Sequence, residues 1–131
     1  MERYGTDSPF EAEIGYCRAV ACDGWIFVAG TTGYDYATMT LPDDVESQCR
    51  SALASVERAL AAFDAGFADV VRVRYILPDR ADWPLCWPLL RAAFAGAPPA
   101  ATMIVAPLQE PRMRFEIEVT ARRPRGTGGG A

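Results

Sequence analysis

The sequence predicts a single α+β domain in which two helices cover one face of a mixed β-sheet. Residues 113–123 alternate apolar and polar side chains, which is the period of a half-buried strand. Residues 45–63 place apolar side chains at three- and four-residue spacing, which is the pattern of one helix face. A chain of 131 residues has the usual size of one domain and can bury roughly two-thirds of the surface that its unfolded form exposes.

The N-terminal half predicts a hairpin and a helix. Strands are expected over residues 16–24 and 25–30, because Asp23-Gly24 between them favours a two-residue hairpin turn. After a long loop, Asp43 is expected to cap the first helix, with Glu46 reaching back to its start. Gly66 is expected to take the left-handed position beyond the helix end. The apolar stripe of this helix consists of Val45, Cys49, Leu53, Val56, Leu60 and Phe63.

The C-terminal half predicts three strands and a second helix. Asp82 is expected to cap a helix that runs to about residue 94. Its regular part should begin near Trp87, because Pro88 would kink a helix interior. Strands are expected over residues 70–77, 101–108 and 113–123, which gives the order β-β-α-β-α-β-β. The first of these strands directs alternate apolar side chains to one face, namely Val71, Val73, Tyr75 and Leu77.

The second face of this sheet is polar. Two of the long strands direct Arg72, Arg74, Glu116 and Glu118 away from the helices. Such a face can meet water. Alternatively, copies of the sheet pack together and bury a lattice of Arg–Glu pairs, which predicts an oligomer with a site at the seam between subunits.

Composition disfavours several classes of function. The net charge is −4 and the arginines are scattered, apart from three near the C-terminus, so we expect no nucleic-acid partner. The chain has neither histidine nor lysine, which excludes Ser-His-Asp and Cys-His catalysis. The four cysteines form no Cys-x-x-Cys pair, so we expect free, buried thiols with no metal and no cofactor. They are Cys17, Cys22, Cys49 and Cys86.

The sequence also bears on location and domain limits. The longest apolar stretch, residues 25–29, is far shorter than the roughly 20 residues that span a bilayer. Residues 1–13 have no signal-peptide core. We therefore expect a cytoplasmic protein without a membrane partner. The domain is expected to occupy residues 1–124, followed by a flexible Gly-rich tail over residues 125–131.

An ordered set of segments resembles the RidA/YjgF family, also called the Rid or endoribonuclease L-PSP family. The resemblance covers about residues 8–123, and no single segment is specific, but their order and spacing are. The segments are Ile14-Gly15-Tyr16, Arg18-Ala19-Val20, residues 25–32, Gln48, residues 69–75, Pro99-Ala100-Ala101-Thr102-Met103 and residues 115–119. This resemblance implies a chorismate-mutase-like subunit, a homotrimer, and small-molecule clefts between subunits. Deaminases of the family hydrolyse enamines or imines to 2-keto acids and ammonia.

One departure from the family pattern bears directly on function. The family deaminases hold the substrate carboxylate with an arginine in a Pro-Ala-Arg-Ser segment, and here that position is Ala101. A carboxylate that leaves water needs a paired cation, and a guanidinium is well suited to it. Either another arginine reaches the site, or the ligand is not a simple 2-imino carboxylate. The candidate replacements are Arg18, Arg74, Arg112 and Arg114.

Other family positions carry over by resemblance. Glu116 matches the glutamate that positions the attacking water, and Tyr16 matches the pocket tyrosine. Met103 stands where a backbone carbonyl assists, and Thr31 and Thr32 belong to the loop that faces the ligand. Trp87 would make the pocket more aromatic. Each has a plainer alternative: Tyr16 as an interface aromatic, Glu116 as an ion-pair partner of Arg72 or Arg74, and Trp87 as packing.

Three functions follow from these residues. The first is a trimeric hydrolase of imines or enamines in which Glu116 positions water. The second is a binding module for a metabolite or protein, which Ala101 favours because the usual carboxylate-binding group is missing. The third, a ribonuclease or translation inhibitor, is suggested by the older family name, and the acidic charge balance and the lack of His and Lys disfavour it.

Overall fold

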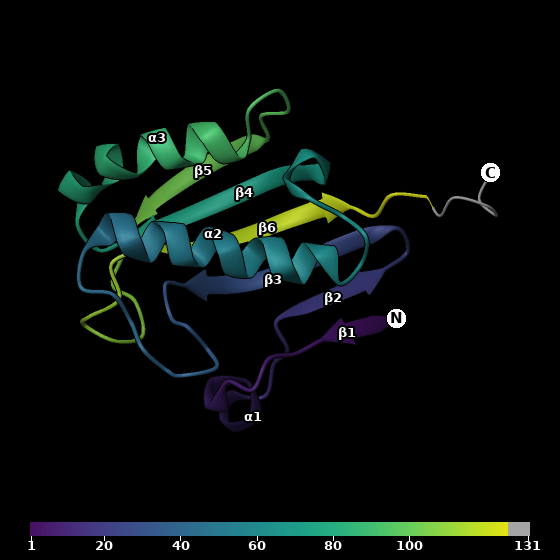
Figure 1. Cartoon of the computed structure of the whole chain (residues 1–131), viewed down its shortest axis with the longest axis horizontal. Helices are drawn as coiled ribbons and strands as arrows, with labels where there is room; N and C mark the ends of the chain where they lie inside the picture. The colour runs from purple at the N-terminus through teal and green to yellow at the C-terminus, as the bar shows by residue number, and fades with distance from the viewer. Residues whose placement is uncertain (126–131) are drawn as a thin grey trace.

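The computed structural model describes residues 1–125 and contains one six-stranded mixed sheet (Figure 1). The sheet order is β1-β2-β3-β6-β4-β5, in which β4 and β5 are parallel and all other neighbours are antiparallel. The strands are β1 (Glu2–Tyr4), β2 (Ala19–Cys22), β3 (Trp25–Thr32), β4 (Val70–Leu77), β5 (Ala100–Val105) and β6 (Glu116–Arg122). The helices are α1 (Pro9–Ile14), α2 (Val45–Ala61) and α3 (Trp83–Ala93), with single 3-10 turns at Phe67–Asp69 and Arg80–Asp82.

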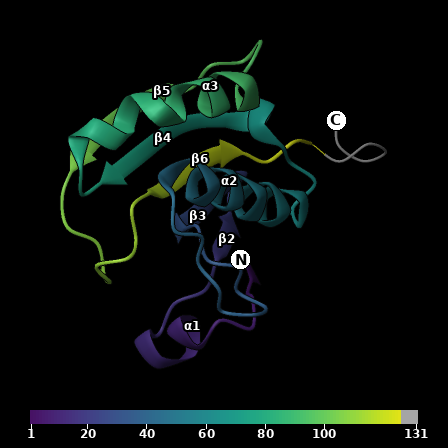
Figure 2. The ribbon, with the colours of Figure 1, turned by 60° about the vertical axis from the view of Figure 1, so that its left-hand side comes forward.

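Both long helices lie on one face of the sheet. Figures 1 and 2 show α2 crossing β3 and β6, while α3 lies along β4 and β5. The core fills the space between these layers. The alternating apolar side chains of residues 113–121 are buried, as their period predicts. They are Met113, Phe115, Ile117, Val119 and Ala121, each at most 3% exposed. The predicted α+β architecture, with two helices on one face of a mixed sheet, is confirmed.

The N-terminus adds two elements that the sequence analysis did not predict. Strand β1 pairs with β2 and forms one edge of the sheet. Helix α1 begins at Pro9, where Ser8 accepts a hydrogen bond from the Phe10 amide, and ends at Gly15 with a left-handed φ of 96°. Each element is too short to give a periodic hydrophobic signal, so neither could be read from the pattern.

Several predicted helix ends were wrong. Asp44, not Asp43, caps α2 by accepting a hydrogen bond from the Ser47 amide. Asp64, not Gly66, takes the left-handed conformation after this helix, with a φ of 61°. Helix α3 begins at Trp83 and keeps Pro88 in its interior. Asp82 precedes this helix but does not cap it through its side chain.

Strand limits also differ from the predictions. Val71 does not face the core: it is 41% exposed, because the pairing of β4 with β6 shifts register between Val70 and Arg72. Such a bulge adds one residue to β4 and interrupts the alternation of its side chains. Strand β2 begins at Ala19 rather than at residue 16, and β5 ends at Val105, before Pro107. Of the predicted tail, only Arg125 lies within the described residues.

A buried amide joins α2 to two loops. The Gln48 side chain donates to the carbonyls of Pro42 and Arg112 at 2.7 and 3.0 Å, and accepts from the Arg114 amide at 2.8 Å. A Cβ atom at Gly33 would lie 2.6 Å from the Gln48 Cα, so only glycine lets this loop approach the helix. Gln48 therefore fixes the segment that leads into β6.

Replacing this amide tests how much it stabilises the fold. Gln48→Leu keeps the side-chain volume but leaves three backbone groups without partners, so the free energy of unfolding should fall by about 3 kcal/mol in urea denaturation. Arg50→Ala is the matched control, since Arg50 lies exposed on the same helix and should change stability by less than about 0.5 kcal/mol. Equal stability of the two variants would contradict the assigned role.

Candidate functional site

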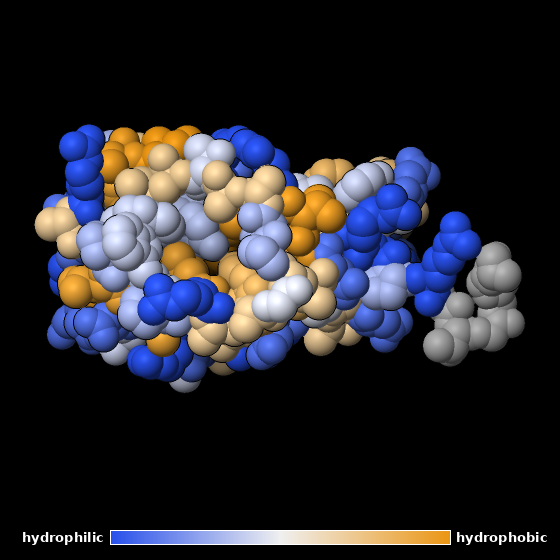
Figure 3. All heavy atoms as spheres, turned by 90° about the horizontal axis from the view of Figure 1, so that it is seen from above, coloured by the Kyte–Doolittle hydropathy of each residue, from blue (hydrophilic) through white to orange (hydrophobic). Residues whose placement is uncertain are grey.

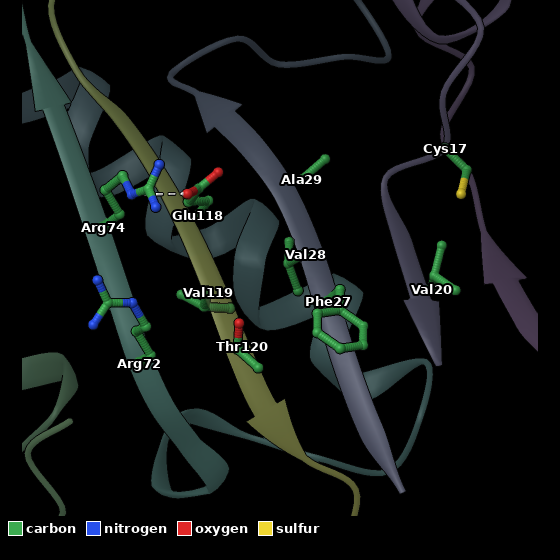
Figure 4. Close-up of a pocket in the computed structure, with 10 residues that line it drawn as sticks. All are labelled: Cys17, Val20, Phe27, Val28, Ala29, Arg72, Arg74, Glu118, Val119 and Thr120. Atoms are coloured by element: carbon green, nitrogen blue, oxygen red, sulfur yellow. Dashed lines mark ion pairs between the residues drawn. The ribbon is translucent and has the colours of Figure 1, made fainter. Parts of the chain in front are cut away.

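The face of the sheet away from the helices is open and partly charged. A hollow of about 400 Å³ lies on it, and Figure 4 shows Arg74 of β4 beside Glu118 of β6, with Arg72 further along β4. The Arg74 Nε lies 3.1 Å from the Glu118 Oε1. Phe27 also faces the hollow and is 49% exposed. The predicted polar face therefore exists and also carries a large apolar side chain.

A buried guanidinium brings together the first group of predicted site residues. The Arg18 side chain is 1% exposed. Its Nη1 donates to the Gly30 carbonyl at 2.8 Å and to the Thr31 Oγ1 at 3.1 Å, and its Nη2 donates to the Tyr16 hydroxyl at 3.2 Å. The Arg18 Cζ also lies 4.5 Å from the centroid of the Tyr36 ring. Arg18 thus fixes Tyr16 relative to the end of β3, which carries Thr31.

The charge of Arg18 has a partial counterpart in α1. The Glu11 Oε2 lies 3.6 Å from the Arg18 Nη2, and Glu11 also accepts hydrogen bonds from Thr6. A buried charge needs such pairing because leaving water costs several kcal/mol. The sequence analysis named Arg18 only as a possible replacement arginine and missed this organising role. A single arginine between polar and apolar residues leaves no periodic signal that would have shown it.

Glu116 lies over the backbone of β3 in the same region. It pairs in register with Thr32, and a Cβ atom at Gly30 would lie 2.9 Å from the Glu116 carboxyl carbon. Burial raises the pKa of the Glu116 carboxyl above its ordinary value of 4.5, the nearby Glu118 adds to this, and Arg18 lowers it in part. A carboxylate with a raised pKa is a stronger base than an ordinary one, so Glu116 can accept a proton from water.

The second group of predicted site residues lies at the other side of the molecule. Trp87 lines a groove of about 480 Å³ along α3 together with Tyr75 and Trp83. The Trp83 ring centroid lies 5.0 Å from that of Tyr75 and 6.4 Å from that of Trp87. Seen from the side on which α3 lies, the surface carries several hydrophobic areas between hydrophilic ones (Figure 3). Trp87 is 46% exposed, so the described residues cover only part of its surface.

Strand β5 places Ala101 and Met103 beside this groove. Met103 pairs in register with Tyr75 and Ala101 pairs with Val73, and both partners are buried beneath the helices. Met103 packs against the core, so Ala101, two residues earlier, belongs to the same face of the strand. These side chains therefore lie on the helix side of the sheet.

The two groups do not meet within one chain. Glu116 shares the open face with Glu118, whereas Ala101 and Met103 belong to the helix side. Strands β6 and β4 also stand between β3 and β5, which separates Thr32 from Met103 by about 14 Å at the usual strand spacing. The predicted site residues therefore fall into two groups, here called half-sites: the first group is Tyr16, Thr31, Thr32 and Glu116, and the second is Trp87, Ala101 and Met103.

The four arginines considered as possible carboxylate-binding groups in place of Ala101 have partners in their own chain. Arg18 is buried as described, and Arg74 pairs with Glu118. Arg112 donates to the Leu41 carbonyl at 3.1 Å. Arg114 makes two hydrogen bonds to the buried carboxylate of Asp82, at 2.9 and 3.1 Å. Among residues 1–125 Glu116 forms no ion pair with Arg72 or Arg74, so its alternative role as an ion-pair partner of either arginine is not borne out.

The described residues contain neither a candidate metal site nor a candidate membrane span. Within residues 1–125, no group of three or more His, Cys, Asp or Glu side chains is placed to hold a metal ion. The four cysteines are free. Among the helices that the structure describes, none is long and apolar enough to span a membrane.

Comparisons with known proteins place the fold in a family. The family model described as endoribonuclease L-PSP matches residues 6–123. The crystal structure of Rv2704 from Mycobacterium tuberculosis, a YjgF/YER057c/UK114 family member, is 35% identical over 92% of this chain and 98% of that chain, with a TM-score of 0.83. NMB1025 from Neisseria meningitidis, a YjgF family protein, is 27% identical over 95% of this chain and 96% of that chain, with a TM-score of 0.81.

A curated relative extends this likeness in sequence. The uncharacterized protein SCO2049 from Streptomyces coelicolor is 28% identical over 124 residues, which cover 94% of this chain and 92% of the relative. The matched residues include both half-sites. The architecture agrees with the chorismate-mutase-like fold expected from the sequence. The chain therefore belongs to the YjgF/RidA family, whose model carries the description endoribonuclease L-PSP.

Proposed function

We propose that the protein is a homotrimer with small-molecule clefts between its subunits, and that it hydrolyses an imine or enamine in these clefts. The observation that carries this proposal is the separation of the two half-sites on opposite faces of one chain. A second copy that lays its open face against α3 and β5 would join Tyr16 and Glu116 of one subunit to Trp87 and Met103 of the next. The half-exposed Arg74–Glu118 pair and Phe27 would then be buried in the assembly.

In the proposed reaction Glu116 acts on water. Its carboxylate accepts a proton from water as the water oxygen bonds to the imine carbon, and it returns this proton to the nitrogen. The carboxylate then takes the hydroxyl proton of this adduct and passes it to the nitrogen as the carbon–nitrogen bond breaks, so that ammonia leaves, a carbonyl compound remains and Glu116 is again a carboxylate. Tyr16, held by Arg18, orients the ligand, and the backbone next to Thr31 and Thr32 lines its other side. An enamine enters the same path after protonation at carbon gives the imine.

The non-catalytic alternative rests on Ala101. Without a guanidinium at this position, a carboxylated imine loses the contact that would fix it for attack. The protein would then hold a metabolite or protein without changing it. Recovery of bound compounds distinguishes the two functions: chemically unchanged ligand together with no ammonia release across a panel of neutral and acidic imines would favour binding alone.

The role of Glu116 predicts a selective loss of turnover. Glu116→Gln should lower kcat/KM for imine hydrolysis at least about 100-fold, because the amide cannot accept the proton. Ammonia release from freshly generated imines measures it, with circular dichroism to verify folding. Glu57→Gln is the control, since it removes an exposed carboxylate from α2, away from the open face and from the proposed base. Equal turnover by wild type and Glu116→Gln would rule out this mechanism.

Because the pKa of Glu116 is raised, we expect this residue to make folding stability depend on pH, which can be measured without substrate. The folded pKa lies above the unfolded value, so the protonated form stabilises the fold below about pH 4.5 and this contribution is lost as pH rises through the folded pKa. Glu116→Gln keeps a neutral group, so it should be more stable than wild type near pH 7 and no more stable near about pH 4. Urea denaturation at both pH values measures the difference, and a pH-independent difference would contradict the assignment.

The proposed trimer predicts a charge-reversal effect. Arg74→Glu places a second carboxylate next to that of Glu118 on the open face. Like charges that are buried in an interface cost several kcal/mol. Light scattering should find three times the chain mass for wild type and a smaller species for this variant. The double swap Arg74→Glu/Glu118→Arg should restore the larger mass. A wild-type monomer at high concentration would refute the assembly.

A further inference from the structure

The groove along α3 is aromatic and carries a single charge. Its described lining consists of Tyr75, Trp83, Trp87, Leu90, Arg91, Phe94, Ala95, Gly96 and Pro98, of which Arg91 alone is charged. None of the ion pairs among residues 1–125 uses Arg91. Helical spacing puts Arg91 one turn after Trp87, so the two side chains belong to the same face of α3.

Chain direction brings Arg91 to the same end of the groove as Ala101. Helix α3 ends at Ala93, residues 94–99 turn the chain, and β5 begins at Ala100. Figure 1 shows β5 returning antiparallel to α3. The last turn of the helix therefore lies beside the first residues of the strand, and Gly96 and Pro98 of the turn line the groove with Arg91.

Arg72 is the nearest competitor and belongs to the wrong face. It stands between the half-sites on β4 and has no ion pair among residues 1–125. Its Nη2, however, lies 3.4 Å from the Thr102 hydroxyl, and it lines the hollow of the open face. Thr102 alternates with Ala101 along β5, so Arg72 is on the opposite side of the strand from the groove.

We propose that Arg91 binds the carboxylate of an aromatic or bulky apolar carboxylic acid, whose body lies against Trp83, Trp87 and Tyr75. The guanidinium that the strand lacks at residue 101 is supplied by the helix. This inference rests on the proposed function, since it names the ligand class of the second half-site. The charge selects a carboxylate over an uncharged group of the same shape, and the rings select an apolar body over a small one.

A pair of matched probes tests the charge. Binding of 3-phenylpropanoate and of the uncharged 3-phenylpropanamide is followed by tryptophan fluorescence, with Trp87→Phe confirming the origin of the signal. Wild type should bind the carboxylate at least about tenfold more tightly than the amide. Arg91→Ala should remove that preference while leaving amide binding unchanged, and Arg91→Lys should retain part of it. Arg50→Ala, on the exposed side of α2, should behave as wild type.

A relocation experiment tests the position. Adding Ala101→Arg to Arg91→Ala returns a guanidinium to the same end of the groove and should restore the carboxylate preference. An equal affinity of wild type for both probes would overturn the proposal, as would a carboxylate preference that survives in Arg91→Ala. The mass of each sample is measured in parallel. A monomer that still prefers the carboxylate through Arg91 would refute the intersubunit cleft alone, whereas a trimer with no Arg91-dependent preference would refute this inference alone.

Discussion

The rest of the structure depends on one constraint, which is the alternation of apolar and polar side chains along β6. This strand lies between β3 and β4 in the sheet, so its alternation sets the character of both faces. Phe115, Ile117 and Val119 bury their side chains beneath the helices, which fixes the register because a shift of one residue would place Glu116 and Glu118 in the core. The same alternation leaves a charged face that none of the elements within residues 1–125 covers. Core and proposed interface are two consequences of one pattern.

Arg18 shows how a polar side chain is accommodated where these two faces meet. Its guanidinium is buried among the Gly30 carbonyl, Thr31 and Tyr16, with Glu11 nearby. Its Nε has no hydrogen-bond partner among the described residues, which is a cost that a purely structural side chain would ordinarily avoid. The arrangement holds the Gly30 backbone against Glu116. Holding this end of β3 beside a carboxylate of raised pKa is a reason to retain a costly buried charge.

The sequence predicted most of the fold because long elements repeat their signal. Helix α2 and strand β6 each present several apolar residues in period, and both were located within a few residues. Strand β1 and helix α1 were missed because three and six residues carry too little periodicity. Val71 was misplaced because a bulge breaks the alternation that the prediction assumed. The half-sites were named residue by residue through the family resemblance, but their separation depends on the sheet order, which local patterns do not encode.

The alanine at position 101 illustrates why a sequence motif alone does not determine a function. A carboxylate is recognised by a guanidinium at the right place and in the right orientation, not by a residue at a given sequence position. The end of α3 and the beginning of β5 lie side by side, so a side chain from either element reaches the same end of the groove. In the proposal, Arg91 reaches the groove from α3, beside Trp87, and not from β5. The aromatic rings that line the groove then remain free to contact the ligand. A relocated cation of this kind would change the preferred ligand towards larger apolar acids while keeping the requirement for negative charge.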